Sequence, residues 1–153
     1  METLNAAEAL HPWLRLTTSL TQKLQHSFAT KPGLSLLGEG LEHGNIWERE
    51  LLSAQQNVYA RHIALTIGGT PVVLARSVTT RGSGMDALTH LKTRPLAELL
   101  FEDSQWERNA NMQYLALDGG VPGRGCLWHN RVLGAGLIVQ EFFLHALIAK
   151  VGP

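Results

Sequence analysis

The segment at residues 59–78 constrains the fold most, because its pattern is that of a β-hairpin. Two runs with alternating apolar residues flank Gly68 and Gly69, and a glycine pair there is typical of a two-residue turn with positive φ. Counting outward from this turn gives four facing pairs on one sheet face, since side chains alternate with period two: Ile67 with Thr70, Leu65 with Val72, Ile63 with Leu74, and Arg61 with Arg76. The hairpin therefore predicts two arginines side by side at the end of an apolar face.

This pair of arginines needs an anion. A register shifted by one residue would move the apolar set of one strand to the other face, and the apolar match across the four pairs argues against such a shift. Like charges directly opposite one another destabilise a sheet, and arginine keeps its proton in proteins. Two interpretations follow. Acidic side chains of the same protein neutralise both arginines, or the pair binds a small ligand that carries two carboxylates.

The composition is that of an ordinary globular protein. A chain of 153 residues that is 44% hydrophobic predicts one domain, residues 1–153. Thirteen basic and thirteen acidic residues balance, so we expect no nucleic-acid partner, because such partners need a basic face. The start, METLNAAEAL, lacks the features of a signal peptide, and the sequence holds no run of about 18 apolar residues that would span a bilayer. We therefore expect a soluble, cytoplasmic monomer with no membrane partner.

The residue types that carry metal or nucleophilic chemistry give little signal. The seven histidines are scattered without the spacing of a metal site, so we expect no metal. His62 follows Arg61 but points to the opposite face, where a structural role is the more frequent one. Cys126 is the single cysteine, which excludes an internal disulfide framework. The sequence shows no base partner for its thiol, and we assign it no nucleophilic role.

The order of elements predicts an α+β fold with an antiparallel sheet. Ser19 and Gln22 fit a capping box that starts a helix at Leu20, and Pro95 opens a second helix. Strands are expected at residues 34–42, in the two arms of the hairpin, at 106–117, and at 126–132 and 137–144 around a second turn at 134–136. Residues 81–84 and 119–125 are expected to be loops, and 46–52 has no clear assignment.

Glu141 is the second unusual residue. In the last expected strand it shares a face with Leu137, Val139 and Phe143. A carboxylate among such neighbours must pair with a cation, accept hydrogen bonds, or hold a proton with a raised pKa. A salt bridge to Arg61 or to the second arginine of the hairpin and a role in ligand binding are both open. Either interpretation places Glu141 near the two arginines.

Three segments of the chain resemble the chorismate pyruvate-lyase family: YARHIALTIGGTPVVLARSV, LKTRPLAELLF and LIVQEFFL, in this order and spacing. The family converts chorismate to 4-hydroxybenzoate and pyruvate, the first step of bacterial ubiquinone biosynthesis. The resemblance covers most of the chain. It implies a single antiparallel sheet with helices packed on it, no cofactor, and chorismate and 4-hydroxybenzoate as small-molecule partners.

The resemblance also implies a set of site residues. Arg61 matches the arginine that binds the ring carboxylate, together with the backbone N–H of Leu20. Arg76 matches the second arginine and would hold the enolpyruvyl carboxylate. Glu141 and the backbone N–H of Leu96 would meet the ring hydroxyl. Arg76 and Glu141 are the expected catalytic residues, with Glu141 in proton transfer.

The sequence also departs from the family pattern. Arg94 replaces a threonine before the helix-opening proline, and residues 123–126 read Gly-Arg-Gly-Cys where the family has Gly-Arg-Arg-Ser. These changes concern the flap over the pocket.

Other functions with the same fold remain open. Effector-sensing domains of some transcription regulators are similar in fold to this family. Such a domain would follow a DNA-binding winged helix of roughly 70 residues, and the chain has no room for one before the hairpin. A family member that binds aromatic acids without turnover is a further possibility.

Overall fold

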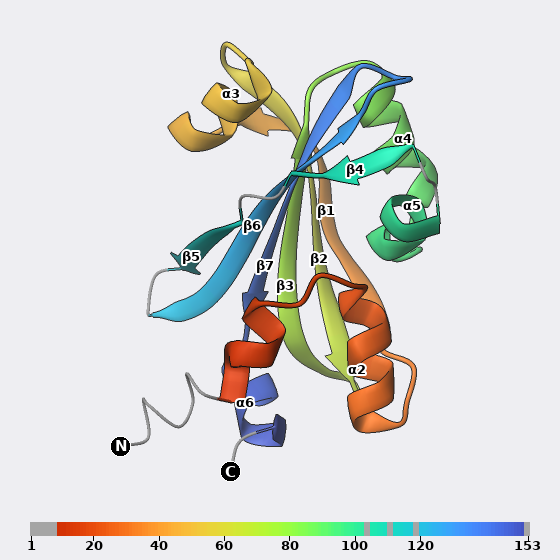
Figure 1. Ribbon diagram of the computed structural model, residues 1–153, viewed down its shortest axis with the longest axis vertical. Coiled ribbons are helices and arrows are strands. Elements are labelled where there is room, and N and C mark those ends of the chain that lie inside the picture. The colour runs from red at the N-terminus through yellow and green to blue at the C-terminus, as the bar shows by residue number, and fades with distance from the viewer. Residues whose placement is uncertain (1–8, 103–104, 110–111, 118–119, 152–153) are drawn as a thin grey trace.

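The computed structural model describes residues 9–102, 105–109, 112–117 and 120–151 (Figure 1). Within these residues, seven strands form one sheet in the order β1-β2-β3-β7-β6-β4, with β5 also paired to β6. Every pairing is antiparallel. The strands are β1 (Gly33–His43), β2 (Asn57–Ile67), β3 (Thr70–Thr79), β4 (Trp106–Arg108), β5 (Gln113–Leu117), β6 (Val121–Asn130) and β7 (Ala135–Phe143). The predicted α+β fold with a single antiparallel sheet is confirmed.

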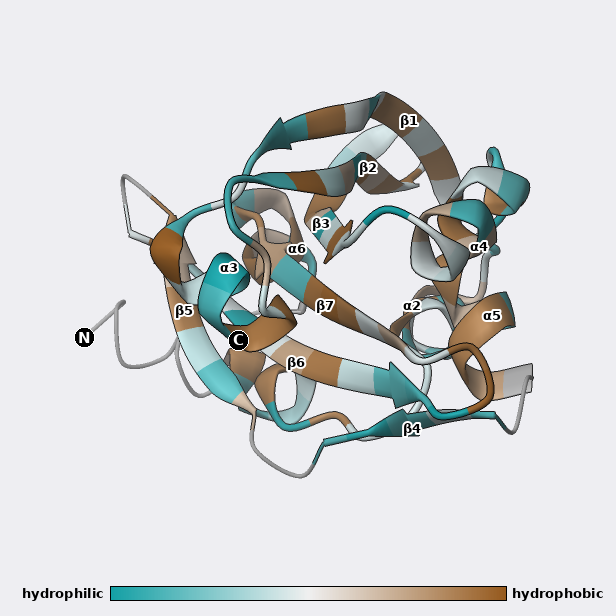
Figure 2. Ribbon diagram, turned by 90° about the horizontal axis from the view of Figure 1, so that it is seen from above, coloured by the Kyte–Doolittle hydropathy of each residue, from teal (hydrophilic) through white to brown (hydrophobic). Residues whose placement is uncertain are grey.

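Helices pack on both faces of this sheet (Figure 2). They are α2 (Leu20–Phe28), α3 (Ile46–Leu52), α4 (Ser83–Leu91), α5 (Leu96–Glu102) and α6 (His145–Val151). Seen from above, α3 lies on one side of β3 and β7, whereas α2, α4 and α5 lie on the other. Apolar residues of α4 and α5, among them Leu88, Leu91 and Leu100, share a buried cluster with Leu137 of β7. No helix in the described part of the chain is long and apolar enough to cross a membrane.

Two helix starts follow from local capping. The Ser19 hydroxyl accepts a hydrogen bond from the backbone N–H of Gln22 at 3.3 Å, and α2 begins at Leu20 as predicted. The segment without an assignment is α3, where Asn45 and Glu48 form a reciprocal capping box. Because Glu48 is also fully buried, the cap ties the start of α3 to the sheet.

Three of the predicted elements differ in extent. Residues 83–84 belong to α4 rather than to a loop, since Leu88 and Leu91 lie at helical spacing and are buried. The single strand expected at 106–117 is two strands, β4 and β5, which both pair with β6; residues 110–111 lie outside the described residues.

The glycine-rich stretch at 119–125 is largely part of β6, which begins at Val121 and not at Cys126. Gly120 has a positive φ in the turn before β6, whereas Gly123 and Gly125, inside the strand, allow close packing. A Cβ on Gly123 would lie 2.5 Å from the ring of Phe142, so β6 needs glycine there.

The register of β2 and β3 differs from the predicted one by a single residue. The turn pairs Ile67 with Thr70, and Thr66 with Pro71, as the predicted register requires, but Leu65 pairs with Val73 and not with Val72. Val72 is the extra residue of a β-bulge. The bulge lets two consecutive valines, Val72 and Val73, enter the same buried cluster, which a regular strand with alternating faces would not allow.

The bulge separates the two arginines. Beyond it, Arg61 faces Ser77 and Arg76 faces His62, so the two guanidinium groups lie on opposite faces of the sheet. The predicted side-by-side pair is therefore wrong, because one inserted residue moves every later side chain of β3 to the other face.

Candidate active site

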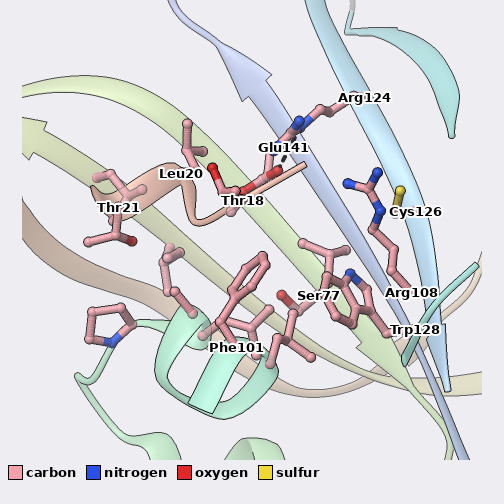
Figure 3. A pocket seen from close by; sticks show the side chains of 18 residues that line it. Thr18, Leu20, Thr21, Ser77, Phe101, Arg108, Arg124, Cys126, Trp128 and Glu141 are labelled. Carbon is pink, nitrogen blue, oxygen red and sulfur yellow. Dashed lines mark hydrogen bonds and ion pairs between the residues drawn. The ribbon is translucent and has the colours of Figure 1, made fainter. Parts of the chain in front are cut away.

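A cavity opens on the face of the sheet that carries α2 and α5 (Figure 3). Its empty space is about 700 Å³, a figure that includes the open mouth. Strand residues such as Ile63 and Val139 form its floor, and Leu100 and Phe101 of α5 form part of its wall. The ring of Phe101 meets Trp128 edge to face, with centroids 5.3 Å apart. The cavity therefore suits an apolar or aromatic ring.

The charged side chains that line the cavity are Glu141, Arg124 and Arg108. The Arg124 Nε atom donates to Glu141 Oε1 at 2.9 Å, and its Nη1 donates to the carbonyl of Leu16. Arg108 Nη1 donates to the same carbonyl at 3.3 Å. The expectation that Glu141 lies near the hairpin arginines is wrong, because β6 places Arg124 directly opposite Glu141, whereas Arg61 is two strands away from β7.

Arg61 is a buried cation, with 1% of its side chain exposed. Its Nη2 donates to the carbonyls of Lys92 at 3.1 Å and Arg94 at 2.7 Å. The Glu39 carboxylate is 4.0 Å from Nε, and neither Nε nor Nη1 has a hydrogen-bond acceptor among the described residues. Burial lowers the pKa of Arg61, and Glu39 only partly offsets it. Arg61 is not part of the cavity wall. However, Arg94, whose carbonyl it binds, lies two residues before Leu96, and Leu96 does line the cavity.

Arg76 is neutralised on the other face of the sheet. Its Nε and Nη2 bind the two oxygens of Glu48 at 2.7 and 2.9 Å, and its Nη1 binds Glu42. His62 contacts Glu42 at 2.8 Å, and Gln140 donates to Glu48 at 2.6 Å. Burial opposes ionisation of Glu48, but the hydrogen bonds from Arg76 and other donors outweigh it and lower its pKa. For Arg76 the interpretation of internal neutralisation holds, and the structure does not bring this residue to the cavity.

Leu20 and Leu96 both line the cavity, at the starts of α2 and α5. Backbone N–H groups in the first turn of a helix have no partner within the helix. The contacts of Arg61 place it beside the start of α5. Glu141 is linked through Arg124 to the segment that leads into α2. These contacts reverse the pairing expected from the resemblance, which put Leu20 with Arg61 and Leu96 with Glu141.

Sequence reasoning missed Arg108 and Arg124 as site residues. Arg108 falls in the strand expected at 106–117 and Arg124 in the loop expected at 119–125, and the sequence pattern singles out neither as a site residue. The turn between β6 and β7 spans residues 131–134, slightly earlier than predicted. Counting back from this turn would have paired Arg124 with Glu141. The signal was present, but the run of glycines obscured the strand.

Cys126 also lines the cavity and is buried. Burial raises the pKa of its thiol, with a further contribution from Glu141, and the nearby arginines 108 and 124 do not compensate. The thiol form is therefore favoured, which does not suit a nucleophile. Among the described residues, no group of three or more His, Cys, Asp and Glu side chains is placed to hold a metal ion.

Comparison with solved structures shows related folds at low sequence identity. The effector domain of PhnF from Mycobacterium smegmatis has a TM-score of 0.54 and 11% identity, covering 84% of this chain and 90% of that domain. The C-terminal domain of the histidine utilization repressor from Pseudomonas syringae has a TM-score of 0.53 and 11% identity, covering 75% and 92%. At this identity the likeness concerns the fold alone.

Comparison with sequences is more specific. A probable chorismate pyruvate-lyase from Methylococcus capsulatus is 30% identical, covering 92% of this chain and 97% of that protein. Another from Shewanella amazonensis is 32% identical, covering 95% and 84%. The model of the chorismate lyase family matches residues 2–152. With this match over nearly its whole length, the chain belongs to the chorismate lyase family.

Proposed function

We propose that the protein cleaves chorismate to 4-hydroxybenzoate and pyruvate, the reaction that begins bacterial ubiquinone biosynthesis. The observation that carries the proposal is the cavity: an apolar pocket with a carboxylate and cations in its wall, in a chain of this family. Chorismate has an apolar ring, which suits the pocket. The ring carries a carboxylate, a hydroxyl group and an anionic enolpyruvyl ether, which suit the charged groups of the wall.

Arg61 would bind the ring carboxylate. Its buried Nε and Nη1 atoms have no acceptor among the described residues, and a buried donor without an acceptor is costly. A carboxylate that reaches past Leu96 would accept a charge-assisted hydrogen bond from Nη1, whereas Nε lies on the side of Glu39, 4.0 Å away. The N–H groups at the start of α5 lie beside this position and would add a further hydrogen bond.

Glu141 would hold the ring hydroxyl at the other end of the cavity, with the N–H of Leu20 nearby. Arg124 fixes one carboxylate oxygen at 2.9 Å, which leaves the other oxygen to the substrate. In the reaction the ether C–O bond breaks, its electron pair goes to the enolpyruvate oxygen, and the hydrogen on the hydroxyl-bearing carbon leaves as a proton. Aromatisation of the ring drives this step, and protonation of the enolpyruvate gives pyruvate.

The protein's tasks are then to orient the ether, exclude water and stabilise the charge that moves onto the leaving group. In this scheme Glu141 would accept or relay a proton. Arg76 has no direct part in this scheme, because Glu48 and Glu42 on the far face hold it.

The proposal is tested by incubating the purified protein with chorismate and separating the products by chromatography. We expect equal amounts of 4-hydroxybenzoate and pyruvate, formed faster than in a protein-free control. If the protein binds 4-hydroxybenzoate in calorimetry but leaves chorismate intact, it is instead a binding module with the same fold.

A further inference from the structure

Two arginines line the cavity beside Glu141 and share one backbone carbonyl. Arg124 holds both Glu141 and Leu16, and Arg108 reaches Leu16 from β4. No acidic side chain among the described residues pairs with Arg108. Counting only residues that the structure describes, the cavity wall thus has two cations and one carboxylate. A cavity wall with this balance favours a ligand with an additional negative charge at this end.

The chemical structure of chorismate fixes the position of its enolpyruvyl carboxylate relative to the ring carboxylate and the hydroxyl group. The hydroxyl-bearing carbon of the ring is opposite the carboxylate-bearing carbon and adjacent to the carbon that carries the enolpyruvyl ether. If Arg61 holds the ring carboxylate and Glu141 holds the hydroxyl, the ether projects from the position next to Glu141. Arg124 and Arg108 are the cationic side chains of the cavity wall there (Figure 3). Arg76 lies on the opposite face of the sheet.

We propose that Arg108 and Arg124 form the subsite for the enolpyruvyl carboxylate, the role that the resemblance implied for Arg76. This inference rests on the proposed function for the identity of the substrate. Arg124 is anchored by Glu141 and keeps a fixed orientation. Arg108 supplies the guanidinium that has no carboxylate partner among the described residues. As the ether bond breaks, the negative charge on the departing enolpyruvate grows next to both arginines, which stabilise it.

The subsite is tested with two unreactive ligands that differ in one carboxylate, so the result does not depend on turnover. The ligands are 3-carboxymethoxy-4-hydroxybenzoate and 3-methoxy-4-hydroxybenzoate, and calorimetry measures the dissociation constant of each. We expect the unsubstituted protein to prefer the carboxymethoxy compound by roughly tenfold to a hundredfold, the range for a hydrogen bond to a charged group. Arg108→Gln should abolish the preference, and Arg108→Lys should retain part of it.

The control variant is Arg131→Gln, which removes one positive charge at an exposed surface pair with Glu107 and should keep the full preference. Arg108 is chosen over Arg124 because a change at Arg124 would also release Glu141. Thermal unfolding of each variant shows whether it is folded.

The outcomes separate the inference from the proposed function. A preference that vanishes in Arg108→Gln supports the subsite even if chorismate is not cleaved, in which case only the lyase assignment fails. Cleavage of chorismate together with an unchanged preference in Arg108→Gln overturns the subsite alone. Failure of the unsubstituted protein to bind either ligand, or equal binding of both, overturns the subsite, and the chorismate assay decides the proposed function separately.

Discussion

Each face of the central sheet buries an ion pair, Arg76–Glu48 on the α3 face and Arg61–Glu39 on the cavity face. The two pairs differ in how many of the buried polar atoms have a hydrogen-bond partner. On the α3 face, Arg76 is held by two carboxylates, and Glu48 also accepts hydrogen bonds from Asn45 and Gln140. On the cavity face, Arg61 has two buried donors for which the described part of the chain offers no acceptor. A saturated network stabilises the fold. The unsaturated network of Arg61 adjoins a cavity, and we propose that a ligand binds there.

The sharpest test of this contrast is Glu141→Gln on the cavity face. Glutamine keeps the hydrogen bond from Arg124 but cannot relay a proton. Turnover of chorismate should therefore fall by about 10²–10⁴, the range for lost acid–base catalysis, while folding and 4-hydroxybenzoate affinity are largely kept. Steady-state kinetics and calorimetry measure the two effects. Near-normal turnover in a folded variant would remove Glu141 from the chemistry and leave orientation by the arginines.

Arg61→Ala should weaken binding of 4-hydroxybenzoate by about 2–5 kcal/mol, as when a buried charge pair loses one partner. The matched ligand is 4-hydroxybenzamide, which has no carboxylate, so the variant should bind it about as well as the unsubstituted protein does. Calorimetry with both ligands decides. An equal loss for acid and amide would mean that Arg61 supports the start of α5 and does not bind the carboxylate.

On the other face, Glu48→Gln should cost about 3 kcal/mol of unfolding free energy, because it leaves Arg76 with only part of its anionic environment. Urea unfolding measures the loss. The affinity of the folded fraction for 4-hydroxybenzoate should not change. A variant of unaltered stability that binds the ligand poorly would place this network in the site.

The ion pair between Glu48 and Arg76 also predicts that the stability of the protein depends on pH. The folded-state pKa of Glu48 lies below its ordinary value of 4.5, so its ionised form contributes stability above about that pH. The contribution is lost as the pH falls through the folded-state pKa. The stability difference between the unsubstituted protein and Glu48→Gln should therefore shrink on acidification below pH 4.5. A difference that stays constant down to the acid transition would contradict the assignment.

The smallest effect is expected for Cys126→Ser. The thiol lines the cavity, but its raised pKa keeps it protonated, and the resembling family has serine at this position. Turnover should change by less than about threefold, within the cost of a minor packing change. A loss of a hundredfold or more would give the thiol a direct role.

Local signals in the sequence were read correctly where one short motif determines the structure. The Ser19 cap placed the start of α2, Pro95 placed α5, and the pair Gly68-Gly69 placed the hairpin turn. Each depends on neighbours within a few residues, so a single sequence contains the needed information.

The site depended on longer-range pairing and was predicted only in part. Glu141, Leu20 and Leu96 do line one cavity, but the arginine beside Glu141 is Arg124. The bulge at Val72 has no strong local signature, because either register buries apolar residues. The packing of the sheet against its helices decides between them, and that packing involves residues far apart in the chain.

The bulge also has an evolutionary consequence. Since Val72 is the residue that sends Arg61 and Arg76 to opposite faces, deleting one residue between the turn and Val73 would exchange the chemical content of the two faces along the rest of β3. Arg76 would enter the cavity side, and Glu48 would lose its counterion. Substitutions in this stretch act on one contact at a time, but a change of length acts on both faces at once. Divergence here is therefore expected to proceed by replacement of residues at constant length.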